Sequence, residues 1–299
     1  MTILGLAEST VAPLIRALYL DDAELDRDAI AERFARAAWG VIAEPGDRDA
    51  GHLLAVLGAE ASVAALTAVP WPPADPEHPD VTPLVTALEA AGDDNLSRSD
   101  LVDAVKRWRS RVSAPSVLLA LRQGARFGAS LLVPDDADWP TGVDELGEHA
   151  PHALWARGDR TLLGRLERSI AIVGARAATG YGEHVTVEAS SGLVDRGFTI
   201  VSGAAYGIDG IAHRAALASA GSTVAFLARG RPVLARRARG APHPHRRTRC
   251  RGVGGAAGNR PDQMAIPAAQ PADRGRQQRH RRRRSGVAVG VVEHGASRG

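Results

Sequence analysis

The segment from Ser169 to Leu227 constrains the fold more than any other part of the chain. Three short apolar runs, at 170–173, 198–201 and 223–227, alternate with two amphipathic helical patterns. Short strands that alternate with helices of ten to fourteen residues are typical of a βαβαβ unit with a parallel sheet. We therefore expect both glycine-rich strand-to-helix turns at the carboxyl edge of the sheet, where such sheets bind ligands.

Charge is distributed unevenly along the 299 residues, although the net charge is only +3. Residues 229–299 contain 18 arginines and three acidic residues, whereas acidic side chains outnumber basic ones in 1–228. Such a basic tail is typical of a nucleic-acid-binding arm, unless a reading-frame error produced it. The single Cys250 rules out an intramolecular disulfide and any multi-cysteine metal site. Neither a secretory leader nor a membrane-spanning apolar run is visible, which predicts a cytoplasmic protein without a membrane partner.

Residues 1–112 are predicted to form a small all-helical domain, to which residues 1–27 are loosely attached. Apolar residues recur at three- and four-residue spacing in 28–67. Helical patterning resumes after a proline-rich linker at 70–83. Two roles stay open for this domain, because contact with DNA or a partner and packing alone both fit the pattern.

Residues 113–228 are predicted to form a Rossmann-like core. A helix over Ser116–Gln123 is expected to end at Gly124, and two strands then precede the βαβαβ unit. The rings of Trp139 and Trp155 are suited to stacking on bases. Roles in the core are favoured for both, because the chain has few aromatic residues.

The first glycine-rich turn has the features of an anion site. Gly174 permits a tight turn, Arg176 projects from it, and Gly180 and Gly182 let backbone amides approach a ligand at the start of a helix. The guanidinium of Arg176 suits phosphate, although pairing with a surface carboxylate is the alternative. The GxGxxG fingerprint is absent and no acidic residue ends the second strand, so neither an NAD site nor another cofactor is expected.

The second turn combines small residues with one aromatic side chain. Ser202–Ala205 lets a bulky ligand lie against the backbone, and Tyr206 offers a stacking face. Asp209 and His213 are four residues apart on the following helix, a spacing that fits a proton-transfer dyad. Capping by Asp209 and packing of His213 is the favoured alternative. No serine, cysteine or carboxylate pair is placed as a nucleophile with its base, and we expect neither a catalytic nor a metal site.

Together the patterns IVGAR…T·YG and IVSGAAYGID···H··AL resemble the DNA-processing protein A (DprA/Smf) family over about residues 30–228. The resemblance implies a non-enzymatic, homodimeric protein with a small helical (SAM-like) module and an extended Rossmann-like domain. It implies binding of single-stranded DNA, protection of incoming DNA, and loading of a RecA-type recombinase in transformation. The implied DNA- or phosphate-binding residues are Gly174, Ala175, Arg176, Thr179, Gly180, Gly182, Ser202, Gly203, Ala204, Tyr206 and Gly207, with Asp209 and His213 as structural residues.

Two positions depart from the pattern of that family. Ala175 stands where the family has a hydroxyl residue, which removes a hydrogen bond to phosphate. Tyr206 stands where many members have arginine, which removes a charge.

The tail, 229–299, has no aromatic residue and no apolar periodicity, which predicts disorder. Read one base late, Arg236–Arg247 can encode an amphipathic helix, and Met264–Gly275 can encode a segment similar to the Arg-Asn-Arg segment of the family. Pro232–Ala235 can give Pro-Tyr-Ser, which is close to a Tyr-Pro turn of the family. We therefore expect that the tail is out of frame and that the parallel sheet is incomplete. We also expect impaired activity and loss of the dimer surface.

Two rival hypotheses follow from the same residues. A nucleotide-binding enzyme of the nucleotide phosphoribohydrolase type needs a catalytic carboxylate beside the phosphate loop, and Asp209 or Glu183 would have to supply it. A basic-tailed interaction protein would instead depend on residues 229–299.

Overall fold

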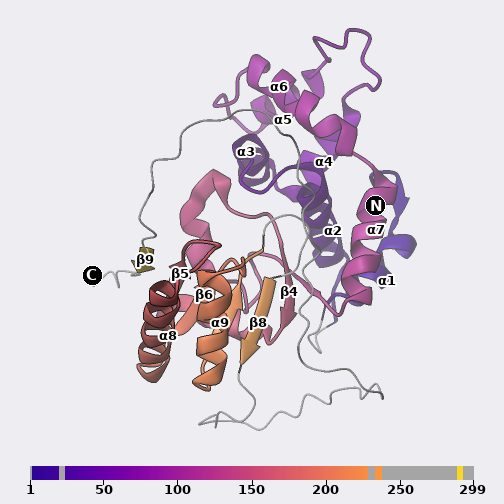
Figure 1. Ribbon diagram of the computed structural model, residues 1–299. Coiled ribbons are helices and arrows are strands. Elements are labelled where there is room, and N and C mark those ends of the chain that lie inside the picture. The colour runs from indigo at the N-terminus through magenta and orange to yellow at the C-terminus, as the bar shows by residue number, and fades with distance from the viewer. Residues whose placement is uncertain (1, 20–23, 228–232, 238–287, 292–299) are drawn as a thin grey trace, which may run out of the picture.

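The structure is a computed structural model that describes residues 2–19, 24–227, 233–237 and 288–291. These residues form a helical half and a half built around a mixed sheet (Figure 1). The helical half contains the hairpin strands β1 (Thr2–Ile3) and β2 (Leu6–Ala7) and the helices α1 (Glu8–Arg16), α2 (Arg27–Ile42), α3 (Arg48–Leu57), α4 (Ala59–Ala68), α5 (Thr82–Ala90), α6 (Arg98–Trp108), η1 (Arg109–Arg111) and α7 (Ala114–Arg126).

The core of the helical half is built around α2. Its apolar residues recur at helical spacing, so that Phe34, Ala38 and Trp39 are completely buried. The ring of Trp39 meets the ring of Trp108 edge to face at 5.1 Å, and its Nε1–H donates to Ser62 Oγ at 2.9 Å. The indole N–H groups of both tryptophans therefore have a hydrogen-bond acceptor, as the burial of polar atoms requires.

The amino-terminal segment is part of this core. Val11, Ile15 and Leu18 are buried against the helical half, and the Leu131 amide donates to Leu18 O at 3.2 Å. The prediction of a loosely attached extension is therefore wrong for the described residues 2–19.

Helix α7 runs through the glycine that was predicted to end it. Gly124 lies inside the helix, and a side chain there would clash with the ring of Trp155, because a Cβ would lie only 2.3 Å from Cζ3. The glycine is thus a packing residue and not a stop signal. Val117 and Leu121 of α7 are buried in the core of the helical half. The division of the chain between residues 112 and 113 stays a prediction.

The described strands of the second half form a seven-stranded sheet in the order β3-β4-β8-β7-β6-β5-β9. Its strands are β3 (Ser130–Leu132), β4 (Leu154–Gly158), β5 (Ser169–Val173), β6 (Thr199–Ser202), β7 (Ser222–Ala225), β8 (Val233–Arg237) and β9 (Ala288–Val291). Strands β5, β6 and β7 are parallel neighbours, with Ile170 opposite Ile200 and Val201 opposite Val224. The predicted βαβαβ unit with its small parallel sheet is confirmed.

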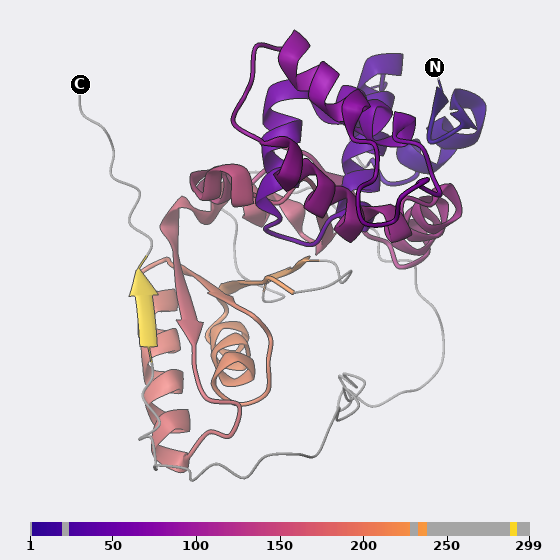
Figure 2. The ribbon, with the colours of Figure 1, turned by 90° about the horizontal axis from the view of Figure 1, so that it is seen from above.

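Helices α8 (Gly180–Asp195) and α9 (Ile208–Ala218) pack side by side on one face of the parallel strands (Figure 1). Right-handed crossovers between neighbouring parallel strands bring both helices to the same face. Ile172, Ile200, Ile208 and Ala212 form the core between that face and the helices. Figure 2 shows α8 and α9 away from the purple helical half, which lies beside the other end of the sheet.

The opposite face is covered by two 3-10 segments, η2 (Thr141–His149) and η3 (Arg160–Arg168). Trp139 and Leu163 are buried there, and Trp139 Nε1–H donates to Asp144 Oδ1 at 2.9 Å. Both Trp139 and the half-buried Trp155 thus pack inside the protein, as favoured from the sequence. A cavity of about 160 Å³ remains between this layer and the sheet.

Strands β8 and β9 were not expected from the sequence. Strand β8 inserts between β4 and β7, and β9 pairs antiparallel with β5 at the sheet edge. The prediction of a tail without regular structure does not hold for these two segments. Every other residue after Leu227 lies outside the described part of the chain, as does Cys250.

Within the residues that the structure describes, no single helix is long and apolar enough to cross a membrane, although α3 and α4 pass by length and composition as a pair bent by 114°.

Candidate functional site

The first loop leaves the carboxyl end of β5 and leads into α8. Thr179 is the N-cap of α8, and its Oγ1 accepts from the amide of Gly182 at 3.1 Å. For the amides of Gly180 and Tyr181, the described part of the chain supplies no acceptor. Unpaired amides at a helix amino terminus carry partial positive charge, so this end of α8 remains open to an anion.

Arg176 lies in this loop and is exposed. Among the described residues, no carboxylate or carbonyl pairs with its guanidinium. The alternative of a surface arginine held by a carboxylate therefore finds no support in these residues. A guanidinium without a protein partner retains all its donors for a ligand.

The two loops touch through their backbones, and glycines make the contact possible. A Cβ on Gly207 would lie 2.2 Å from Ala175 O, and Gly207 has a φ of +82° that side chains disfavour. A Cβ on Gly174 would lie 2.7 Å from Ile208 Cγ1. Gly174 and Gly207 thus serve close packing between the loops.

Asp209 links the two loops through hydrogen bonds. It is 6 % exposed, its Oδ1 accepts from the amide of Gly174 at 3.3 Å, and its Oδ2 accepts from the amide of Ala205 at 3.4 Å. The sequence interpretation as a helix cap is wrong, because Gly207 is the N-cap of α9 and no side chain caps it. Asp209 lies instead within the first turn of α9 and reaches back to both loops.

The amino terminus of α9 differs from that of α8 because one carbonyl from each loop accepts from its first turn. The amide of Ile208 donates to Ala175 O at 3.2 Å, and that of Gly210 donates to Ala205 O at 3.1 Å. Among the described residues at this edge, α8 therefore presents the more open amino terminus. Gly180 has no heavy atom within 4 Å of a hypothetical Cβ, so the space above its backbone is free.

The remaining predicted residues of the second loop divide into buried and exposed positions. Ser202 is 4 % exposed and its Oγ donates to Ile172 O at 2.7 Å, so its hydroxyl joins β6 to β5. Ala204 adopts a φ of +54°, which turns the chain after the exposed Gly203. Tyr206 projects from the loop and is 64 % exposed.

His213 packs against the sheet and forms no dyad with Asp209. Its Nδ1 lies 2.6 Å from Thr223 Oγ1, and that hydroxyl donates to Ile200 O at 2.7 Å. The hydroxyl therefore accepts from the Nδ1–H of the ring. Burial lowers the pKa of His213, although the charge of Asp209 raises it in part. A neutral, packed histidine agrees with the favoured sequence interpretation.

One exposed residue at this edge was missed in the sequence. Tyr181, the second residue of α8, is 78 % exposed. The signal was its place between Gly180 and Gly182, where an aromatic side chain has no neighbouring bulk on which to pack. The described residues contain no cluster of three or more side chains that would hold a metal ion.

By its fold and its open loop edge, this is a Rossmann-like α/β protein. Residues 130–238 match the family described as DNA recombination-mediator protein A. A DNA processing protein DprA of Mycobacterium tuberculosis is 45% identical over 128 residues, which cover 40% of this chain and 32% of that protein. The DNA processing protein DprA of Bacillus subtilis is 31% identical over 160 residues, which cover 54% of this chain and 50% of that protein.

The X-ray structure of DNA processing protein A from Streptococcus pneumoniae aligns at 22% identity with a TM-score of 0.35, covering 56% of each chain. The chain spans about a third to a half of the length of the curated relatives named above. The matched segment contains both loops, so residues 130–238 of this chain are similar to the DprA/Smf family.

Proposed function

We propose that this protein takes part in DNA processing for recombination and transformation by binding single-stranded DNA at the loop edge of its sheet. The observation that carries the proposal is the open amino terminus of α8 beside the unpartnered, exposed Arg176. The relatives named above are DNA processing proteins, and their matched segments support the same role here.

Two kinds of donor at this edge suit a phosphodiester. The amides of Gly180 and Tyr181 lie in the first turn of α8, where the helix dipole favours negative charge. The guanidinium of Arg176 supplies paired N–H groups that match two phosphate oxygens. Contacts of this type position a strand and carry little sequence information.

Within this site the first loop and the start of α8 bind phosphate through Arg176 and the amides of Gly180 and Tyr181. Thr179 holds the helix start, and the Gly182 amide is already bonded to its hydroxyl, so Gly182 is not a phosphate donor as the sequence predicted. Gly203, Ala204, Tyr206 and Gly207 shape the adjacent wall. Ser202 acts through the sheet, because its hydroxyl is buried. Gly174, Ala175, Asp209 and His213 keep the loops in place.

Binding of a fluorescent oligo-dT by the full chain at moderate salt tests the proposal. Arg176→Ala removes charge-assisted hydrogen bonds, and we expect its Kd to rise about tenfold. Arg176→Lys keeps the charge and should lose less. Arg122→Ala, which changes an exposed arginine of α7, is the matched control and should bind as the parent does.

An unchanged Kd for Arg176→Ala would contradict the site. Release of free base from nucleoside monophosphates would favour the enzymatic rival, in which Glu183 would have to act because Asp209 is buried and bonded to both loops. Binding that persists in Arg176→Ala and falls steeply with salt would assign the DNA to the arginine-rich tail.

Loading of a RecA-type recombinase and formation of a homodimer are further parts of the proposal. They rest on the family resemblance, and size-exclusion chromatography and a recombinase filament assay on single-stranded DNA test them. The out-of-frame origin of residues 229–299 is tested by resequencing the locus together with mass spectrometry of the carboxyl terminus. Recovery of the present tail from cells would remove that hypothesis.

A further inference from the structure

We infer that Tyr181 and Tyr206 form two stacking platforms for unpaired bases beside Arg176, so that this edge binds bases as well as phosphates. The inference rests on the proposed function and adds Tyr181 as a residue that selects unpaired DNA. The two side chains are 78 % and 64 % exposed, which are the highest exposures recorded for large apolar or aromatic residues in the described chain.

The loops place both tyrosines next to the same backbone. Tyr206 directly precedes Gly207, whose Cα lies against the carbonyls of Ala175 and Arg176. Tyr181 follows Gly180 in α8, and the next residue, Gly182, approaches Ile208 at the start of α9. Tyr181 therefore belongs to the same segment as Arg176, which is the first loop and the start of α8. Tyr206 belongs to the second loop, which contacts that segment.

Neither ring is buried in the fold of the described residues. The third tyrosine of the chain, Tyr19, is half-buried beneath the Arg33 guanidinium at 4.7 Å, as an ordinary structural tyrosine would be. For Tyr181 and Tyr206, no hydrogen bond or ring contact is recorded with any described residue. Both exposed tyrosines of the chain are thus gathered at the edge where Arg176 is also exposed.

Aromatic rings and bases stack face to face, and this contact tolerates any base because each has a π face. In a duplex the base faces are covered by their neighbours, so stacking on a tyrosine requires an unpaired strand. Arg176 and the α8 amides would hold phosphate in either form of DNA. The tyrosines would then supply the preference for single-stranded DNA.

A comparison of oligo-dT with an abasic strand of equal length separates base contacts from phosphate contacts. We expect Tyr181→Ala to raise the Kd for oligo-dT about tenfold and to leave the Kd for the abasic strand unchanged. Tyr181→Phe keeps the ring and should retain binding. Val187→Ala removes another exposed apolar side chain from α8 and serves as the matched control.

Photocrosslinking gives a second measurement that does not depend on the variants. With oligo-dT that carries one 5-iodouracil, mass spectrometry should find the crosslink on the peptides that contain Tyr181 and Tyr206. An unchanged oligo-dT affinity for Tyr181→Ala, or an equal loss for both strands, would overturn the inference. Failure of Arg176→Ala to weaken either strand would instead overturn the phosphate site, so the two proposals fail separately.

Discussion

At the residue scale, Asp209 determines how the two loops lie against each other. Its carboxylate accepts one amide from each loop while almost fully buried. The two hydrogen bonds are part-buried, and amides that lose such an acceptor destabilise the fold. The position of Arg176 therefore depends on a residue that contacts no ligand in the proposed site.

We expect Asp209→Ala to lower the free energy of unfolding by about 2 kcal/mol, since it removes two part-buried hydrogen bonds and leaves the amides of Gly174 and Ala205 without their acceptor. Chemical denaturation followed by circular dichroism measures the change. Glu183→Ala, which removes an exposed carboxylate from α8, should stay within about 0.5 kcal/mol of the parent. Equal stabilities of the two variants would show that Asp209 does not hold the loops.

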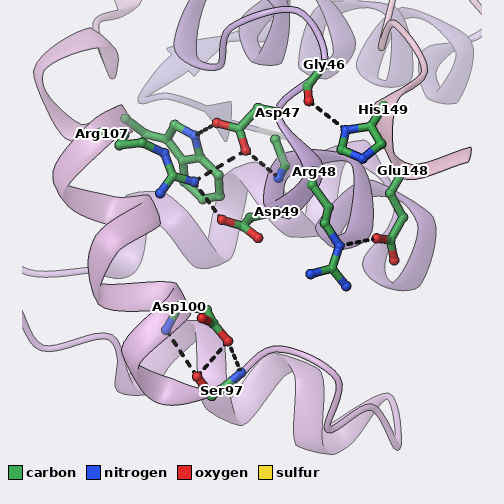
Figure 3. A network of polar contacts seen from close by, with 11 residues as sticks. Gly46, Asp47, Arg48, Asp49, Ser97, Asp100, Arg107, Glu148 and His149 are labelled. Atoms are coloured by element: carbon green, nitrogen blue, oxygen red, sulfur yellow. Dashed lines mark hydrogen bonds and ion pairs between the residues drawn. The ribbon is translucent and has the colours of Figure 1, made fainter. Parts of the chain in front are cut away.

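At the element scale, several helices begin where a side chain accepts a hydrogen bond from one of their first amides. Asp26, Asp47 and Ser97 accept from the amides at the starts of α2, α3 and α6. At α6 the Ser97 Oγ accepts from the Asp100 amide at 3.2 Å, and Asp100 Oδ2 accepts from the Ser97 amide at 3.0 Å (Figure 3). This reciprocal pair is a capping box.

Ser97→Ala should lower the free energy of unfolding by about 1 kcal/mol, because the Asp100 amide loses its acceptor. Ser97→Thr keeps a hydroxyl at the N-cap and should cost less. Thermal unfolding monitored at 222 nm compares the two variants with the parent. A Tm for Ser97→Ala equal to that of the parent would mean that solvent caps α6 equally well.

At the scale of the whole molecule, a polar seam joins the helical half to the segment that leads into the sheet. Arg48 of α3 pairs with Glu148 of η2, and His149 approaches Gly46 O at 2.9 Å (Figure 3). His52 lies between Asp93 and Glu148, at 2.8 and 2.7 Å. Burial lowers the pKa of His52, but the hydrogen bonds to the two carboxylates outweigh it and raise the pKa above its usual value.

A second histidine in the same region has the opposite pH dependence. Burial lowers the pKa of His152 to about 4, with a smaller contribution from the Arg36 charge. The folded protein therefore binds fewer protons there than the unfolded chain, whose histidines titrate near 6.5. This contribution to stability is complete above pH 6.5 and is lost as the pH falls towards 4.

We expect acidification from pH 6.5 to 4 to cost the parent about 3 kcal/mol through His152, from the linkage of about 1.4 kcal/mol per pKa unit. His152→Phe should lose that part of the slope in unfolding experiments across this range. His52→Gln should act oppositely, because His52 stabilises the fold below pH 6.5 and less as the pH rises through its raised pKa. An unchanged acid slope in His152→Phe would contradict the assignment.

The sequence by itself determined the βαβαβ unit, since apolar runs and helical periodicity between Ser169 and Leu227 are local signals. The short loop patterns at Gly174–Gly182 and Ser202–Asp209 also indicated the similarity to the DprA/Smf family that residues 130–238 show. Arg176 is exposed to solvent, which the hypothesis of a phosphate site requires.

Which residues of those loops face solvent and which hold the loops together depends on how the chain packs in three dimensions. Gly124 lies within a helix and leaves room for Trp155 of a distant strand, and Asp209 bonds to two loops instead of capping its own helix. The Ser202 hydroxyl bonds to β5 inside the sheet, and the Tyr181 side chain is exposed. Local sequence patterns do not predict such contacts, because the contacting residues are far apart in sequence and meet only when the chain packs.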